Sequence, residues 1–164
     1  MKEPRSGCPI NAAVEALGDH WSLLVLRDVI FGDRRYFREL QAGSIEGIAS
    51  NILADRLKKL VAAGILSRED AERGARARYS LTEAGIQTLP IIFALGNWGL
   101  DWRNGTRELR IRQELMRHEG HRFIQEFMDE LRANHLGAVP AKRPSPGASE
   151  RLSAAYTQAT RGLD

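Results

Sequence analysis

The chain has 164 residues, of which 43% are apolar and 27% charged, with a formal net charge of +3. These values are ordinary for a globular protein with a hydrophobic core of its own, and they exclude a chain too polar to fold. The single cysteine, Cys8, excludes an intrachain disulfide and fits a reducing compartment. The first residues lack an apolar leader, and no apolar run approaches the about 20 residues that a membrane span requires, so we expect a cytoplasmic protein.

The first third of the chain shows the apolar periodicity of helices separated by glycines. The pattern predicts helices over residues 10–17, 20–31, 36–41 and 48–63. Pro9 suits the start of the first helix, and Asp19 can accept hydrogen bonds from the free amides that begin the second. Ser44 can satisfy backbone groups in the glycine-rich turn before the fourth, which Gly64 ends.

Alternating residues then predict a β-hairpin, with strands over 65–70 and 76–82 and a turn over 72–75. Side chains of successive strand residues point to opposite faces. One face of the second strand is expected to carry Ala77, Tyr79 and Leu81. The other is expected to carry Arg76, Arg78 and Ser80.

The remainder is predicted to be helical. One helix, capped by Thr82, runs toward Trp102 and is kinked or interrupted at Pro90, and a second covers 106–134 with a possible break at Gly120. Residues 140–149 have the composition of a linker, and the last fifteen form either a loosely held helix or none. We therefore expect three parts: a first domain over 1–104, a helical extension over 105–139, and a linker and tail over 140–164.

Helices, a tight turn, a longer helix and a hairpin, in this order, are the layout of a winged helix-turn-helix: a mainly α fold with a small β-hairpin wing (α+β) and a C-terminal helical extension. The helix over 48–63 buries its leucines and leaves small and polar residues outward, which suits entry into a major groove about 12 Å wide. Asn51 could bond to adenine and Lys58 to guanine or a phosphate, whereas Asp55 could accept from cytosine or pair with a neighbouring lysine. The candidate recognition residues are Ser50, Asn51, Ala54, Asp55 and Lys58.

Basic residues gather in the same region: from Arg34 to Arg78 there are ten, against six acidic ones. Cations beside a recognition helix are suited to contacts with the phosphate backbone of DNA. The alternative is that the charges of the hairpin only keep this surface hydrated and the protein soluble. The candidate backbone and wing residues are Arg34, Arg35, Arg56, Arg73, Arg76 and Arg78. For Arg56, pairing with a neighbouring carboxylate is an equal alternative.

Several blocks together resemble the HxlR family of bacterial regulators, a branch of the MarR-like winged-helix proteins. They are CPINAAVEALGDHWSLLVLRDV, YFREL, EGIASNILADRLKKLVAAGIL and RYSLTEAG, in order between Cys8 and Trp102. The resemblance implies a homodimer whose first and fifth helices supply much of the interface. It also implies two recognition helices on a pseudo-palindromic operator of double-stranded DNA.

Cys8 has two interpretations. Some members of the family use a cysteine at the matching place to sense oxidants or electrophiles, which requires a thiolate favoured by a helix N-terminus and by cations such as Arg5. With one cysteine per chain, such a switch would run through an intersubunit disulfide, a mixed disulfide or an adduct. The alternative is a small buried side chain before Pro9.

For two histidines and three tryptophans, we expect no functional role. His118 and His121 are expected to be solvated rather than to bind a metal. Trp21, Trp98 and Trp102 are expected to pack in the core or in a dimer, with an effector pocket as the weaker alternative.

The sequence thus predicts a homodimeric DNA-binding regulator, such as a repressor, that responds to a small-molecule effector or a redox signal. A winged-helix adaptor that binds proteins instead of DNA is the alternative. No P-loop, nucleophile elbow or dinucleotide fingerprint is present, so we expect neither an enzyme nor a cofactor, metal or membrane partner.

Overall fold

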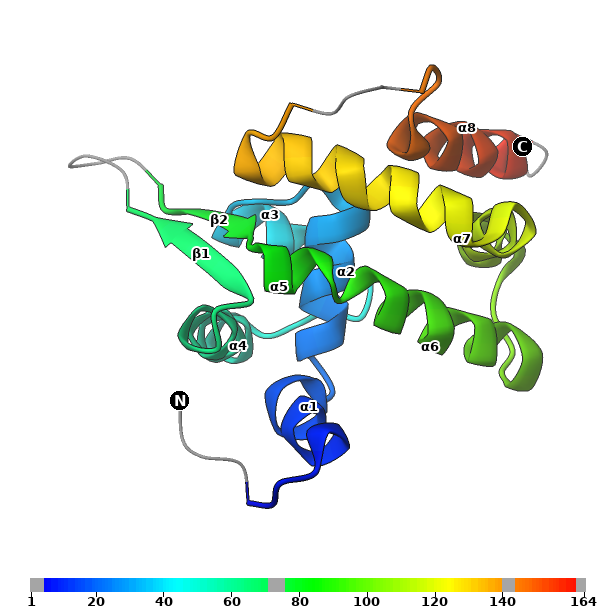
Figure 1. The fold of residues 1–164 in the computed structure, drawn as a ribbon. Helices are drawn as coiled ribbons and strands as arrows, with labels where there is room; N and C mark the ends of the chain where they lie inside the picture. The colour runs from blue at the N-terminus through cyan, green and yellow to red at the C-terminus, as the bar shows by residue number, and fades with distance from the viewer. Residues whose placement is uncertain (1–4, 71–75, 140–143, 162–164) are drawn as a thin grey trace. The chain divides into compact units, whose positions relative to one another are not determined.

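The computed structural model describes residues 5–70, 76–139 and 144–161 (Figure 1). Contacts divide the chain after Ile86 into two compact units, Met1–Ile86 and Gln87–Asp164. The boundary expected from the sequence lies later, after residue 104.

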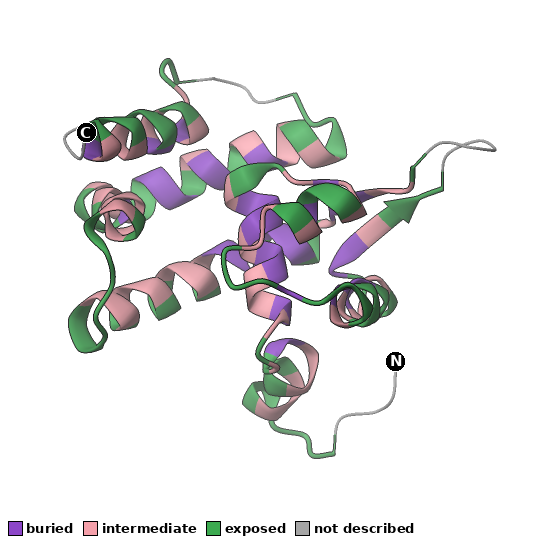
Figure 2. Cartoon of the chain, turned by 180° about the vertical axis from the view of Figure 1, so that it is seen from behind, coloured by how far each residue is buried: buried purple, intermediate pink, exposed green. Residues whose placement is uncertain are grey.

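The first unit begins with four helices, each within two residues of its expected bounds. They are α1 (Pro9–Leu17), α2 (Ser22–Gly32), α3 (Phe37–Ala42) and α4 (Ser50–Ala62). The second helix is the most buried of them, with Leu26 and Val29 wholly excluded from solvent (Figure 2). Because α3 and α4 both contact α2, this helix forms the centre of the unit's core.

A two-stranded antiparallel sheet follows, formed by β1 (Leu66–Glu69) and β2 (Arg78–Leu81). Leu66 lies opposite Leu81, and both are buried. The mainly helical fold with a β-hairpin is therefore confirmed. Within the expected turn, residues 72–75 lie outside the described part of the chain.

Glycine at two positions is required by the backbone around the hairpin. Gly64 follows α4 with a φ of +70°, a left-handed conformation that glycine adopts without steric cost, as expected for a helix-ending glycine. Gly85 lies in α5 (Glu83–Ile86), where an added Cβ would lie 2.2 Å from the carbonyl oxygen of Ile65. Thr82 caps this turn, since its Oγ1 accepts from the Gly85 amide at 3.1 Å.

The second unit contains α6 (Leu89–Trp102), α7 (Arg107–Leu136) and α8 (Ala148–Thr160). Pro90 occupies the first turn of α6, so the predicted interruption of the helix after Thr82 is confirmed. The predicted break at Gly120 is also confirmed, because its φ of 71° and ψ of −153° are not helical.

Polar side chains fix α6 against α7. Gln113 Nε2 donates to the carbonyl of Phe93 and to Oδ1 of Asn97, both at 3.0 Å, and Arg117 pairs with Asp101 at 2.6 Å. The segment that sequence patterns left undecided forms α8, which packs on α7 (Figure 1). Among the described residues, no helix combines the length and apolar character that crossing a membrane requires.

Candidate nucleic-acid interface

One side of α4 faces solvent and the other forms core. Leu53, Leu57 and Leu60 are at most 1% exposed, as their spacing of three and four residues predicts for a helix. The opposite side carries the five candidate recognition residues, all exposed: Ser50, Asn51, Ala54, Asp55 and Lys58. A leucine-backed helix with small and polar residues outward has the form that a major groove accepts.

The turn before α4 is held by two side chains. Ser44 Oγ accepts from the Ile48 amide at 3.1 Å, so its expected role in the turn is confirmed. Arg27 on α2 donates to both carboxylate oxygens of Glu46, at 2.6 and 2.8 Å. Such a bidentate pair fixes direction as well as distance, and here it fixes the approach of the chain to α4.

Asp19 joins the start of α2 to the flank of α4. One carboxylate oxygen accepts from the backbone amides of Trp21 and Ser22, at 3.0 and 2.9 Å, which confirms Asp19 as the cap. The other lies 3.0 Å from Lys59 Nζ and 3.1 Å from Arg56 Nη1. Burial opposes ionisation, but the hydrogen bonds from Ser22 and Lys59 outweigh it and hold the pKa of Asp19 well below its usual range.

Arg56 pairs with carboxylates, one of the two alternatives that its sequence position left open. It lies between Asp19 and Asp55, the second at 2.6 Å from its Nη2. The same guanidinium therefore steadies Asp55, whose side chain remains 62% exposed on the recognition face. In this arrangement the Arg56 side chain lies along the flank of α4 and pairs with carboxylates instead of extending toward a phosphate.

Arg35 does not serve as a surface contact, and its assignment to the phosphate backbone is contradicted by its burial. Only 5% of the residue is exposed. Its Nε donates to the carbonyl of Tyr79 at 3.2 Å and its Nη2 donates to Ser80 Oγ. Burial lowers the pKa of this guanidinium. Ser80 was expected on the face opposite Tyr79, together with arginines. It is nevertheless only 2% exposed, because the Arg35 side chain that donates to it covers this face.

Arg34 is half-buried and lies 3.4 Å from the carboxylate of Asp28, which also binds Arg27. Burial raises the pKa of Asp28, against the attraction of these two guanidinium groups. Arg34 therefore contributes to a charged cluster on α2 and presents only part of its side chain to a partner.

The described part of the wing offers two of its three expected arginines. Arg76 is exposed, and Arg78 is half-buried opposite Glu69 in the sheet. Arg73 lies outside the described residues. The hairpin is thus positioned by the bonds of Arg35 to β2, while Arg76 remains available for contact.

Cys8 is exposed and lies immediately before α1, so the interpretation of a small buried side chain is wrong. Trp98 and Trp102 are 48% and 68% exposed, which excludes a core position in this chain. Within the described ranges, no group of three or more histidine, cysteine or acidic side chains could hold a metal ion.

Two sets of long-range contacts were not predicted from the sequence: the pairing of Asp19 with the flank of α4, and the hydrogen bonds from Arg35 to β2. Asp19 was identified as a cap, but nothing in the local pattern connects it to Lys59, forty residues later. Arg35 carries no local signal that separates it from the exposed arginines.

Comparison with known proteins places most of the first unit in one family. Residues 16–107 match the sequence model of the family described as HxlR-like helix-turn-helix. The HTH-type transcriptional regulator sll1512 of Synechocystis sp. is 38% identical over 96 residues, which are 58% of this chain and 70% of the relative. The HTH-type transcriptional regulator YvaP of Bacillus subtilis is 31% identical over 97 residues, 58% of this chain and 88% of the relative.

Solved structures agree with the sequence matches. PA1607, assigned as a transcription factor, has a TM-score of 0.56 at 35% identity, with 63% of this chain and 70% of that chain covered. A MarR-family regulator from Porphyromonas gingivalis W83 has a TM-score of 0.53 at 29% identity, covering 62% and 99%. The redox regulator HypR in its oxidised form has a TM-score of 0.50 at 28% identity, covering 60% and 100%.

Proposed function

Because the chain belongs to the HxlR-like helix-turn-helix family, we propose that it is a transcriptional regulator that binds a pseudo-palindromic operator in double-stranded DNA as a homodimer. The observation that carries this proposal is the exposed face of α4, where Asn51, Asp55 and Lys58 stand on a helix backed by buried leucines. Asn51 offers the paired donor and acceptor that adenine requires, and Lys58 a cation for guanine or phosphate.

Asp55 has a defined role in this proposal. Arg56 holds its carboxylate at 2.6 Å, and a carboxylate so held can accept from the amino group of cytosine. Arg76 on the wing supplies phosphate contacts, which add affinity without reading sequence. Arg35 supports the hairpin and takes no part in contact.

Apolar faces on two helices support the homodimer. On α1, Ile10 and Val14 are 73% and 58% exposed. On α6, four large apolar side chains at spacings of four, three and four residues face solvent: Ile91, Leu95, Trp98 and Trp102. A second copy of the chain is the occupant we propose, because a two-fold pair covers the same patch on both copies and an operator with two half-sites requires two α4 helices about 34 Å apart, one turn of DNA.

The dimer is tested by Leu95→Asp, which places a charge in the apolar face of α6. We expect the variant to sediment as a monomer and to lose operator affinity at least tenfold. Leu136→Asp, at a similarly exposed leucine near the end of α7, is the matched control. A Leu95→Asp variant that remains a dimer contradicts the assignment of this face.

DNA reading is tested by gel shift with the DNA upstream of the protein's own gene, against scrambled DNA of equal length. Asn51→Ala combined with Lys58→Ala should abolish discrimination between the two, whereas Arg76→Ala should weaken both similarly. Binding should fall steeply with salt, and Arg122→Ala, on α7, should bind as the unmodified protein does. Unchanged selectivity in the double variant would refute the assignment of the α4 face.

A redox signal is the second part of the proposal. Cys8 is an exposed thiol at the start of α1, beside the apolar face proposed for the dimer. Oxidation by diamide joins two thiols as a disulfide, within the dimer or with a small thiol, while the diamide is reduced to its hydrazine. We expect diamide to change operator affinity and Cys8→Ser to remove the response. Equal affinity before and after treatment would eliminate the sensor.

A further inference from the structure

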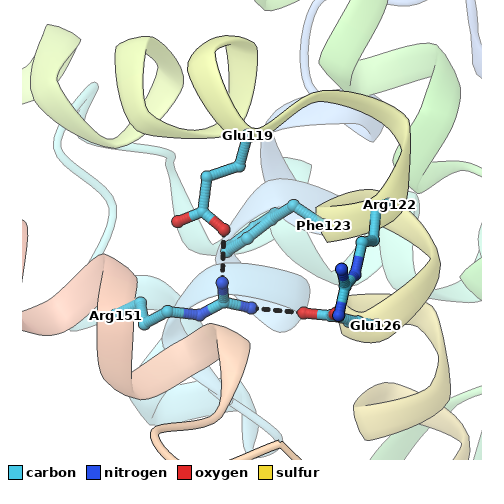
Figure 3. Close-up of a pocket in the computed structure, with 5 residues that line it drawn as sticks. All are labelled: Glu119, Arg122, Phe123, Glu126 and Arg151. Atoms are coloured by element: carbon cyan, nitrogen blue, oxygen red, sulfur yellow. Dashed lines mark hydrogen bonds and ion pairs between the residues drawn. The ribbon is translucent and has the colours of Figure 1, made fainter.

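A pocket of about 290 Å³ lies between α7 and α8, outside the residues that match the family (Figure 3). Four of its lining residues come from α7, and α8 supplies Arg151. The lining residues are Glu119, Arg122, Phe123, Glu126 and Arg151. The pocket therefore belongs wholly to the C-terminal unit.

Three residues of α7 contact the guanidinium group of Arg151. Arg151 places its central carbon 4.6 Å from the centre of the Phe123 ring. Its Nη1 donates to Glu119, and its Nη2 donates to Glu126 at 2.6 Å (Figure 3). An aromatic face with two carboxylates at its edge satisfies both properties of a guanidinium, its positive charge and its planar set of donors.

The break at Gly120 changes the direction of α7 within this site. Seven residues of straight helix separate Cα atoms by about 10 Å, whereas a guanidinium offers its two terminal nitrogens close together. Gly120, between Glu119 and Phe123, has a φ of 71° and turns the chain there. The two carboxylates consequently approach one cation from the two sides of the turn.

We propose that Glu119, Phe123 and Glu126 form a binding site for a small guanidinium compound, and that Arg151 occupies this site as an internal competitor. Arg151 itself fits incompletely, since its Nε is buried without an acceptor among the described residues. A free ligand orients without the constraint of a helix backbone. When it binds, it displaces the Arg151 side chain, and α8 loses its ion pairs with α7.

The attachment of α8 permits this exchange. Its buried residues are Ala148, Leu152 and Ala159, of which one is a large apolar side chain. A cation–π contact of Arg112 with Tyr156, at 4.4 Å, adds to them. An occupant tethered by a short linker acts at an effective concentration of about millimolar, so an added ligand must exceed this range to displace it.

The test uses the full chain with Arg151→Ala, titrated with methylguanidinium by calorimetry at constant ionic strength. We expect saturable one-to-one binding, at least tenfold tighter than to the unmodified protein. Adding Glu126→Gln should weaken it at least tenfold, and methylurea, a neutral planar analogue, should not bind. Arg110→Ala is the matched control, because Arg110 pairs with Glu114 on the same helix, at 3.2 Å, but does not line the pocket, and its removal should bring no gain in affinity.

Three outcomes overturn the proposal: Arg151→Ala binds no better than the unmodified protein, binding survives Glu126→Gln, or methylurea binds equally. Circular dichroism establishes that the variant is folded, and Arg151→Gln replaces it if it is not. Hydrogen exchange in the unmodified protein gives an independent measurement. There, 50 mM methylguanidinium should accelerate exchange of the α8 amides relative to 50 mM methylurea, and equal rates count against the proposal.

Discussion

Asp19 and Lys59 lie 3.0 Å apart, and this contact joins the start of α2 to the flank of α4. The same carboxylate reaches Arg56, which holds Asp55 on the exposed face. The residues proposed to contact bases therefore stand on a helix whose orientation depends on an acidic side chain that contacts no DNA.

Replacing Asp19 by asparagine should destabilise the protein. The amide keeps one acceptor for the amides of Trp21 and Ser22 but removes the charge that Arg56 and Lys59 face. Hydrogen bonds to charged groups contribute about 2 kcal/mol, and we expect a loss of this size in the free energy of unfolding by urea. Asp129→Asn, which removes an exposed pair with Arg132, is the control and should cost less than about 0.5 kcal/mol. Equal losses in the two variants would show that Asp19 has no special role.

The contribution of Asp19 should also depend on pH. Its pKa in the folded protein is below the ordinary value of 3.8, so its stabilising effect is complete above that value and declines as the pH falls toward the folded pKa. The difference in unfolding free energy between the unmodified protein and Asp19→Asn should be constant from pH 7 to 5. It should decrease by about 1 kcal/mol by pH 3. A difference that does not change with acid would contradict the lowered pKa.

Arg35 and Arg76 should separate stability from DNA binding. Arg35→Gln leaves Tyr79 O and Ser80 Oγ without their buried donor, and we expect it to cost about 2 kcal/mol of stability. Arg76→Gln, at an exposed position, should change stability by less than about 0.5 kcal/mol and reduce affinity for all DNA sequences. Thermal unfolding together with gel shift distinguishes the two. Full stability in Arg35→Gln would return this arginine to the surface contacts.

Gly85→Ala should be destabilising although alanine favours helices. The new Cβ would meet the carbonyl oxygen of Ile65, a backbone atom, at 2.2 Å, and overpacking of this kind costs about 2 kcal/mol. Gly99→Ala in α6 is the opposite case, since nothing lies within 4 Å of its Cβ position, and it should stabilise by up to about 1 kcal/mol. Melting temperatures of the two variants should therefore move in opposite directions.

Local chemistry explains which parts of the fold were predictable. Pro90 lacks an amide hydrogen and begins a helix where a continuous one was otherwise possible. Gly64 and Gly120 adopt conformations that other residues rarely take. These constraints act within a few residues, so the sequence alone was sufficient to locate the boundaries of the elements before α8. The exposed face of α4 followed from helical period in the same way.

Tertiary pairing explains what was not predictable. Ser80 alternates with Tyr79 along β2 and should face the opposite side, yet Arg35 covers it and both strand faces are buried there. Arg35 and Arg34 are neighbours with the same side chain, and their different burial depends on strand β2, more than forty residues away. No pattern within a single segment carries that information.

The apolar stripe on α6 makes the lifetime of the protein depend on its concentration. A lone copy exposes Ile91, Leu95, Trp98 and Trp102 to water, so covering them by self-association stabilises the folded state through mass action. Dilute chains would then unfold more readily and be degraded sooner, whereas concentrated chains would protect one another. Under the proposed assembly, the cellular dose of this regulator sets its survival as well as its occupancy of DNA.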